Sequence, residues 1–256
     1  MSFENPSTGA LKADHISKAF GGLKVFNDVS FTLQPGGLLG VIGPNGAGKT
    51  TMINIISGRL RLSSGEVTLG GTRVDGRPVY ENTSRGLVRS FQQTATFHGY
   101  TIEDNLLSAL RFSKSDLSIL ERLMPLLDQF GLKANWGRNA EILPYGLQKM
   151  LGLTMALAAR PKMLLLDEPA AGLEKSERDN IDTYVRFARE EFGCGVLLVE
   201  HDMELIKRLC PSIIVLDGGR LIAEGAPAEV LSYPHVINAY LGGADENEED
   251  ADAQHS

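Results

Sequence analysis

Short apolar runs, separated by turns and by segments of helical periodicity, define the plan of this chain. Near the N-terminus, partial alternation of apolar and polar side chains predicts strands with one buried face, at residues 11–16 and 25–33. Unbroken apolar runs predict fully buried strands, at residues 38–42, 163–166 and 196–200. Shorter runs beside turn residues predict further strands, at residues 66–69, 88–92, 213–216 and 221–224.

The middle of the chain changes to leucines spaced three and four residues apart. Thr101, followed by Glu103 and Asp104, is the expected N-cap of a helix, and the helical spacing continues to Gly131. No strand candidate interrupts residues 101–140. A helical subdomain, at about residues 94–160, is therefore expected between two strand-bearing halves of an α/β protein.

Helices are also expected on both sides of the later strands. One begins at about Lys49 and ends at Gly58, and another opens near Pro144 and ends at about residue 159. Ser176, with Asp179 three residues on, predicts a capped helix that ends at about residue 192. Short helices are expected at residues 227–231 and 234–241.

Composition and charge fit one ordinary globular domain with polar ends. The chain has 256 residues, 43% of them hydrophobic, and a formal net charge of −7. Six acids lie within residues 243–256, which leaves −1 for residues 1–242 and argues against non-specific attraction to nucleic acid or anionic lipid. We expect a flexible leader at residues 1–10, one domain at 11–242 and a disordered acidic tail at 243–256.

Cysteine use and hydropathy indicate a protein of the cytoplasm. The two cysteines, Cys194 and Cys210, have no metal-ligand spacing and are expected to be free thiols in a reducing compartment. The apolar runs are far shorter than the ~20 residues of a membrane helix. Any contact with a bilayer should therefore occur through a partner.

A glycine-rich segment after the strand at residues 38–42 carries the strongest chemical signal. It fits G-x-x-x-x-G-K-[ST] at every fixed position, a phosphate-binding loop whose backbone N–H groups and helix N-terminus face the phosphates. Lys49 should reach the β- and γ-phosphates, and the Thr50 hydroxyl should ligate Mg²⁺. The predicted nucleotide-binding residues of this segment are Gly43, Pro44, Asn45, Gly46, Ala47, Gly48, Lys49, Thr50 and Thr51.

Polar groups at the ends of other predicted strands complete a hydrolytic site. Asp167 and Glu168 end an apolar strand about 120 residues after the loop, where Asp167 can hold Mg²⁺ and Glu168 can polarise a water. A lone histidine is more often structural than functional, but the position of His201 just past the next strand, on the same sheet edge, favours contact with phosphate. Gln92 follows a strand directly and could serve a metal-bound water, although such a residue alone is usually a solvated loop residue.

Phe20 has two interpretations. Its ring could stack on the adenine base, because a flat apolar face on a loop can hold a base without hydrogen bonds. The residue by itself favours the second interpretation, a phenylalanine of the hydrophobic core.

With these residues assembled, the chain resembles the ATP-binding subunits of ATP-binding-cassette (ABC) transporters over nearly all of residues 11–242. The resemblance implies a P-loop NTPase cassette with a mixed sheet core, an antiparallel β subdomain and an inserted helical subdomain. It makes Phe20 the adenine-stacking aromatic, Gln92 the Q-loop glutamine and a metal ligand, Glu168 the catalytic glutamate and His201 the switch histidine. It assigns the signature motif, with Gly146, to residues 143–147, the Walker B motif to residues 164–168 and the D-loop to residues 171–174.

Finer features resemble the ATPases of branched-chain amino acid importers. These features lie at residues 20–23, 56–58, 143–146, 167–173 and 236–242. The resemblance implies ATP and Mg²⁺ as ligands, a second ATP-binding subunit, identical or different, two transmembrane permeases and, indirectly, a periplasmic binding protein. It also implies a peripheral location on the cytoplasmic face of the inner membrane. ATPases of urea and short-amide importers share much of the pattern and remain an alternative.

Three positions depart from the family pattern. Pro144 replaces the signature serine, Leu147 replaces a glutamine, and Met155 stands where arginine is common. In the family, this serine binds the γ-phosphate of the ATP that the second subunit holds. Because Pro144 has neither the hydroxyl nor an N–H, about one hydrogen bond to that phosphate, roughly 1 kcal/mol, would be lost. Gly146 and the helix N-terminus remain available to bind the phosphate.

Other classes of ATPase fit less well. A soluble P-loop kinase is a further alternative. It would need a site for the phosphate acceptor, and it would have no reason to carry the signature motif followed by a long helix. Chromosome-maintenance ATPases insert a long coiled coil before the signature, whereas only 51 positions separate Gln92 from Leu143.

Overall fold

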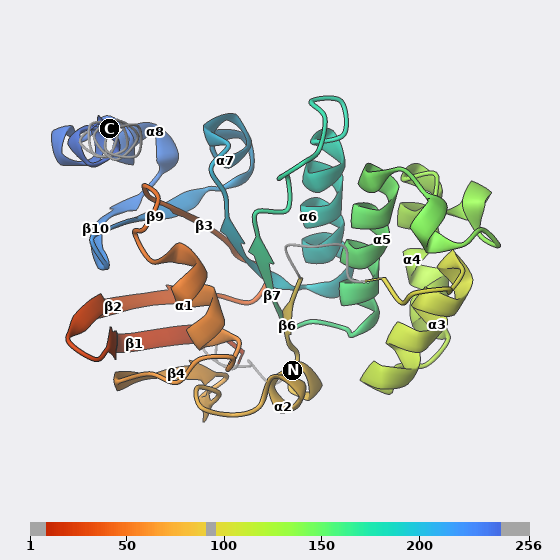
Figure 1. Ribbon diagram of the computed structural model, residues 1–256, viewed down its shortest axis with the longest axis horizontal. Helices are drawn as coiled ribbons and strands as arrows, with labels where there is room; N and C mark the ends of the chain where they lie inside the picture. The colour runs from red at the N-terminus through yellow and green to blue at the C-terminus, as the bar shows by residue number, and fades with distance from the viewer. Residues whose placement is uncertain (1–8, 91–95, 242–256) are drawn as a thin grey trace, which may run out of the picture.

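The computed structural model describes residues 9–90 and 96–241, and these form two sheets flanked by helices (Figure 1). The larger sheet has the strand order β10-β9-β3-β8-β7-β6. Its strands are β3 (Leu38–Ile42), β6 (Leu87–Arg89), β7 (Met163–Asp167), β8 (Gly195–Val199), β9 (Ser212–Asp217) and β10 (Arg220–Gly225). All neighbours pair in parallel except β9 and β10, so the sheet is mixed.

The smaller sheet is antiparallel and has the order β2-β1-β4-β5. Its strands are β1 (Leu11–Phe20), β2 (Leu23–Leu33), β4 (Ser64–Leu69) and β5 (Thr72–Arg73). It packs with α1 (Lys49–Ile56) on one face of the six-stranded sheet, and Figure 1 shows it at the lower left. The predicted combination of a mixed sheet core and an antiparallel β subdomain is confirmed.

Helices cover the opposite face of the large sheet. They are α3 (Ile102–Ser113), α4 (Ser118–Gln129), α5 (Tyr145–Ala158), α6 (Asp179–Phe192), α7 (Met203–Leu209) and α8 (Pro227–Val230), and residues 234–241 are also helical. In Figure 1, α3, α4 and α5 lie beyond α6 at the right-hand end of the molecule. Between residues 96 and 162 the described chain is free of strands and has one isolated bridge, from Thr101 to Asn139. This agrees with an inserted helical subdomain, whose limits stay predictions.

The alternation of side chains along β3 explains how one strand joins two cores. Leu38 and Ile42 contribute to the core under the helices, whereas Leu39 and Val41 contribute to the core under α1 and the antiparallel sheet. Both faces of β3 are therefore apolar, as its unbroken hydrophobic run requires.

Several local predictions need correction. β1 extends to Phe20 rather than ending at residue 16, and the strand expected at 88–92 is β6, which ends at Arg89. The predicted cap at Ser176 is wrong: α6 begins at Asp179 after Arg178, without a side-chain cap. Residues before it form a turn in which the Glu177 carboxylate accepts from the backbone N–H of Glu174 at 3.0 Å. The sequence pattern also missed β5, α7 and α2 (Val79–Ser84).

Candidate functional site

Three glycines give the loop between β3 and α1 its shape. Gly43, Gly46 and Gly48 have φ values of 154°, 79° and 98°, and Gly48 is the N-cap of α1. A Cβ at Gly43 would lie 2.1 Å from the carbonyl oxygen of Leu216, and one at Gly48 would lie 3.0 Å from the Phe26 ring. A larger residue at any of the three positions would strain the backbone, and at Gly43 or Gly48 it would also displace neighbouring atoms.

Lys49 extends back into this loop. Its side chain is buried, and Nζ donates to the carbonyl oxygens of Gly43 at 2.8 Å and Pro44 at 2.9 Å. Burial lowers the pKa of Lys49, against the opposing charges of Glu168 and Asp167. The phosphate loop and the acids of β7 thus lie side by side, as the spacing predicts.

Asp167 ends β7 in a buried position. Its side chain is 1% exposed, and Oδ2 accepts from Nη2 of Arg89 at 3.0 Å. Burial raises the pKa of Asp167, although the Arg89 guanidinium opposes that rise. Oδ1 is buried and has no hydrogen-bond partner among the described residues.

The oxygens present suit a magnesium ion that is shared with a nucleotide. The orphaned Asp167 Oδ1 offers one hard ligand, directly or through water, and Thr50 is exposed in the first turn of α1. Among the described residues, no group of three or more His, Cys, Asp or Glu side chains could enclose a metal without further ligands. Phosphate oxygens and water would have to complete the shell. Gln92, the third predicted ligand, lies outside the described residues.

Glu168 and His201 meet at the same sheet edge. Glu168 Oε1 lies 2.8 Å from His201 Nε2, and both side chains are partly exposed to solvent. The backbone of Glu168 is left-handed, with φ of 49°, an unusual conformation for a residue with a side chain. With His201 beside it, the Glu168 carboxylate can accept a proton from a water, while the imidazole orients the carboxylate.

The predicted signature motif begins α5. Pro144 is the N-cap and makes no side-chain cap, and Tyr145 is exposed. Gly146 is buried, and a Cβ there would lie 2.1 Å from Oε1 of Glu177. A larger residue at position 146 would therefore require the Glu177 carboxylate to move.

The exposed ring of Phe20 contradicts its interpretation as a core residue. Phe20 ends β1 and is 49% exposed, and the Lys18 ammonium lies 4.7 Å from the ring centroid. An exposed ring at the end of a strand remains available for stacking.

Sequence reasoning missed three charged residues behind the site. Lys149 Nζ donates to the carbonyl oxygens of Ala171 at 2.6 Å and Glu168 at 3.3 Å. The buried Glu200 carboxylate accepts from the backbone N–H groups of Ala170 and His201. Arg89 holds Asp167. The available signal was the same each time: a charged residue within or beside an apolar element, where only a partner makes burial tolerable.

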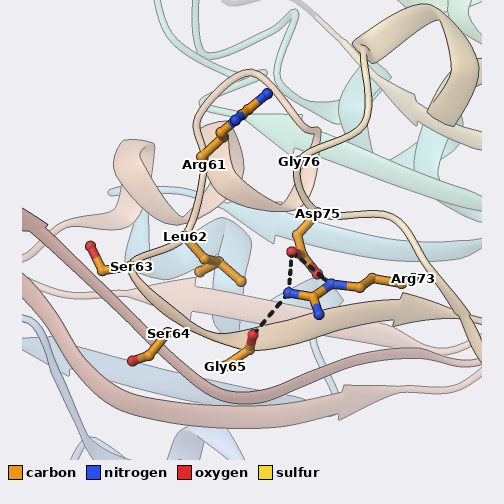
Figure 2. Close-up of a pocket in the computed structure, with 8 residues that line it drawn as sticks. All are labelled: Arg61, Leu62, Ser63, Ser64, Gly65, Arg73, Asp75 and Gly76. Atoms are coloured by element: carbon orange, nitrogen blue, oxygen red, sulfur yellow. Dashed lines mark hydrogen bonds and ion pairs between the residues drawn. The ribbon is translucent and has the colours of Figure 1, made fainter.

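A separate polar hollow lies on the antiparallel sheet (Figure 2). There Arg73 is paired with Asp75 at 2.9 Å and also donates to the carbonyl of Gly65, and Arg61 lies at the rim. It contains none of the predicted nucleotide-binding residues.

Comparisons with protein families identify the cassette. Residues 26–171 match the family described as ABC transporter, and residues 220–246 match the one described as branched-chain amino acid ATP-binding cassette transporter. Among solved structures, the ADP conformation of an ABC transporter's ATP-binding cassette has a TM-score of 0.79 at 28% identity. It covers 91% of this chain and 99% of that chain. A nucleotide-free cassette has a TM-score of 0.78, also at 28% identity, and covers 90% of this chain and 98% of that one.

Named relatives span almost the whole chain. The high-affinity branched-chain amino acid transport ATP-binding protein BraF of Pseudomonas aeruginosa is 34% identical over 250 residues, 91% of this chain and 98% of BraF. LivG of Escherichia coli, with the same description, is 33% identical with equal coverage. The lipopolysaccharide export system ATP-binding protein LptB of Escherichia coli is 32% identical and covers 91% of this chain and 97% of LptB. The chain, with its phosphate loop beside the acids of β7, therefore belongs to the ABC transporter family and is an ATP-hydrolysing subunit of that family.

Proposed function

We propose that this chain powers the import of branched-chain amino acids by hydrolysing ATP at the cytoplasmic face of the inner membrane. The match of residues 220–246 to the branched-chain amino acid family carries the choice of substrate. The cassette alone discriminates little, because BraF and LptB are 34% and 32% identical to the chain. No helix among the described residues is long and apolar enough to cross a bilayer. In this proposal two permeases form the pathway, supplied by a periplasmic binding protein.

The arrangement of side chains supports a division of labour in hydrolysis. Lys49, held in the loop by two carbonyl groups, moves its ammonium to the β- and γ-phosphates when nucleotide binds. Glu168 orients the attacking water and accepts its proton, and His201 fixes the carboxylate from the other side. A bound Mg²⁺ would neutralise phosphate charge, held by Thr50, Asp167 and Gln92. Phe20 stacks on the adenine.

A second ATP-binding subunit closes each site. The phosphate loop contacts one side of the triphosphate, and the N-terminus of α5, with Gly146, covers the γ-phosphate held by the other subunit. No acidic residue of α5 itself lies in its first turn, although the Glu177 carboxylate occupies the space beside Gly146. We favour a different chain as the partner subunit.

A hollow on the helical subdomain suits a permease helix. Phe97, Tyr100 and Phe112 line it, with Ser108 and Arg111 beside them. The Phe97 ring lies 5.8 Å from that of Tyr100 and 5.9 Å from that of Phe112, which is 78% exposed. Exposed aromatic clusters of this kind favour docking of an apolar helix.

Replacing Glu168 by glutamine tests the hydrolytic assignment. Glu168→Gln should retain ATP binding, lower ATP hydrolysis at least about 100-fold and trap the closed pair of subunits, because the amide cannot accept the proton. Hydrolysis is measured by phosphate release and pairing by gel filtration with ATP. Glu204→Gln, an exposed acid of α7, is the matched control. Wild-type turnover in Glu168→Gln would refute the role of Glu168.

The substrate is tested with the assembled transporter. Tagged chain is purified from detergent-extracted membranes, and the complex is reconstituted with its binding protein. Leucine, isoleucine or valine should stimulate ATP hydrolysis, and urea or short amides should not. Stimulation by urea alone, or copurification with lipopolysaccharide, would overturn the substrate assignment and leave the ATPase assignment intact.

A further inference from the structure

The end of strand β6 places an arginine between the two halves of the phosphate site. Arg89 donates from Nη2 to Asp167 Oδ2 at 3.0 Å and from Nη1 to Asn54 Oδ1 at 2.6 Å. Its side chain is 10% exposed and that of Asp167 is 1% exposed. One guanidinium therefore ties β6 to β7 and to α1, the helix that starts with Lys49 and Thr50.

Strand register explains why Arg89 reaches Asp167. Arg89 pairs with Leu165 in the parallel ladder, and Asp167 follows Leu165 by two residues, so all three side chains lie on one face of the sheet. Leu165 belongs to the core that α1 covers. The guanidinium consequently lies between the sheet and α1, where Asn54 is available as a second acceptor.

Only one oxygen of Asp167 is used by this pair. Oδ1 is buried without a partner among the residues that the structure describes, as a ligand kept for another group would be. A guanidinium, with two nitrogens on separate acceptors, fixes the rotation of a carboxylate better than a single ammonium can. Groups that hold a metal ligand from behind commonly change metal affinity 10- to 100-fold when they are removed.

We propose that Arg89 is a positioning residue for magnesium: it holds Asp167 by Oδ2 so that Oδ1 faces the metal, and its bond to Asn54 keeps Asp167 in register with Thr50. This inference rests on the proposed assignment of Asp167 and Thr50 to Mg²⁺. Arg89 itself contacts neither metal nor phosphate in this role. Without it, the carboxylate rotates freely and loses the partner of a buried oxygen.

The coupling between metal and nucleotide binding tests the proposal without measuring turnover. Affinity for a non-hydrolysable ATP analogue is measured by calorimetry in EDTA and in Mg²⁺. The dissociation constant in EDTA divided by that in Mg²⁺ gives a ratio that is compared between variants. Arg89→Gln should reduce this ratio about 10-fold, with metal-free affinity changed less than about twofold. Arg89→Lys, with one donor centre for two acceptors, and Asn54→Ala should give intermediate losses.

The controls separate this proposal from the assignment on which it rests. Arg73→Gln removes an arginine–aspartate pair of the antiparallel sheet and should leave the ratio unchanged. Asp167→Asn, which removes the proposed metal ligand itself, should give the smallest ratio of the series. An unchanged or larger ratio in folded Arg89→Gln would overturn the role of Arg89, and if that variant does not fold, unchanged ratios in Arg89→Lys and Asn54→Ala would do so. A wild-type ratio of one would instead overturn the magnesium assignment itself.

Discussion

Single buried charges fasten the catalytic loops to elements far away in the sequence. Lys149 joins α5 to the carbonyl oxygens of Glu168 and Ala171, and Glu200 holds the backbone of Ala170 and His201. Burial lowers the pKa of Lys149, while Glu200 and Glu168 oppose that change. The left-handed backbone at Glu168 is thus supported from α5, through Lys149, and from β8, because the N–H of Glu168 donates to the carbonyl oxygen of Val199 at 2.9 Å.

Pro144 permits a test at the residue scale. Pro144→Ser supplies a hydroxyl and an N–H at the start of α5, and should raise ATP hydrolysis or ATP-driven pairing several-fold, since one hydrogen bond contributes about 1 kcal/mol. Pro144→Ala, which restores the N–H alone, is the control. Phosphate release and gel filtration give the answer.

A rise in thermal stability alone would mean that the new hydroxyl only caps α5. No change in hydrolysis or in pairing would show that position 144 does not contact phosphate.

At the element scale, sequence patterns predict the strands and loops of the site better than they predict the side-chain contacts that hold those loops in place. β3 matches its predicted limits because both of its faces are buried, and the cap of α3 at Thr101 forms as a capping box with Asp104. By contrast, the contact from Arg89 to Asp167 depends on which strands become neighbours. Sequence periodicity carries no information on that pairing.

Helix α7 shows how a cap couples to pH. Asp202 Oδ1 accepts from the N–H groups of Glu204 and Leu205, and Oδ2 pairs with Arg178 at 2.6 Å. Burial alone would raise the pKa of Asp202, but the bond from Leu205 and the Arg178 pair outweigh it and lower that pKa below 3.8. The stabilisation is therefore complete above pH 3.8 and is lost as the pH falls through the folded value.

Asp202→Asn should remove this pH dependence. Asparagine keeps the capping oxygen but neither titrates nor forms the ion pair. The urea midpoint of the wild-type protein should fall more steeply below about pH 4 than that of the variant. Parallel curves would show that Asp202 does not set acid stability.

The aromatic hollow gives a second test at this scale. Phe112→Ala should abolish copurification with the permeases and leave ATP hydrolysis by the isolated chain unchanged, because the ring lies on α3 and not at the phosphate loop. Tyr80→Ala, which removes a ring of α2 that is 71% exposed, is the matched control. Equal recovery of permeases with both variants would contradict docking at the hollow.

At the scale of the whole molecule, two cores share the six-stranded sheet. Both cysteines lie in the core beneath the helices, and burial raises the pKa of Cys194 and of Cys210 to about 12. Free thiols at these positions confirm the expectation from cysteine spacing. Their reaction with a reagent therefore reports opening of the core.

Alkylation measures that opening. At pH 8 the native protein should react orders of magnitude more slowly than glutathione, two thiols per chain should react in urea, and magnesium with ATP should slow the native reaction further. A thiol that reacts at the rate of glutathione in the native protein would contradict the burial of that side chain.

The position of β3 also constrains how the protein can be made. This strand delivers the phosphate loop, yet its two neighbours, β8 and β9, are synthesised about 150 residues later. While residue 217 is still inside the ribosome, the carbonyl of Leu216 cannot pack against Gly43, so the phosphate loop is incomplete. ATP therefore cannot assist folding before Leu216 has left the ribosome.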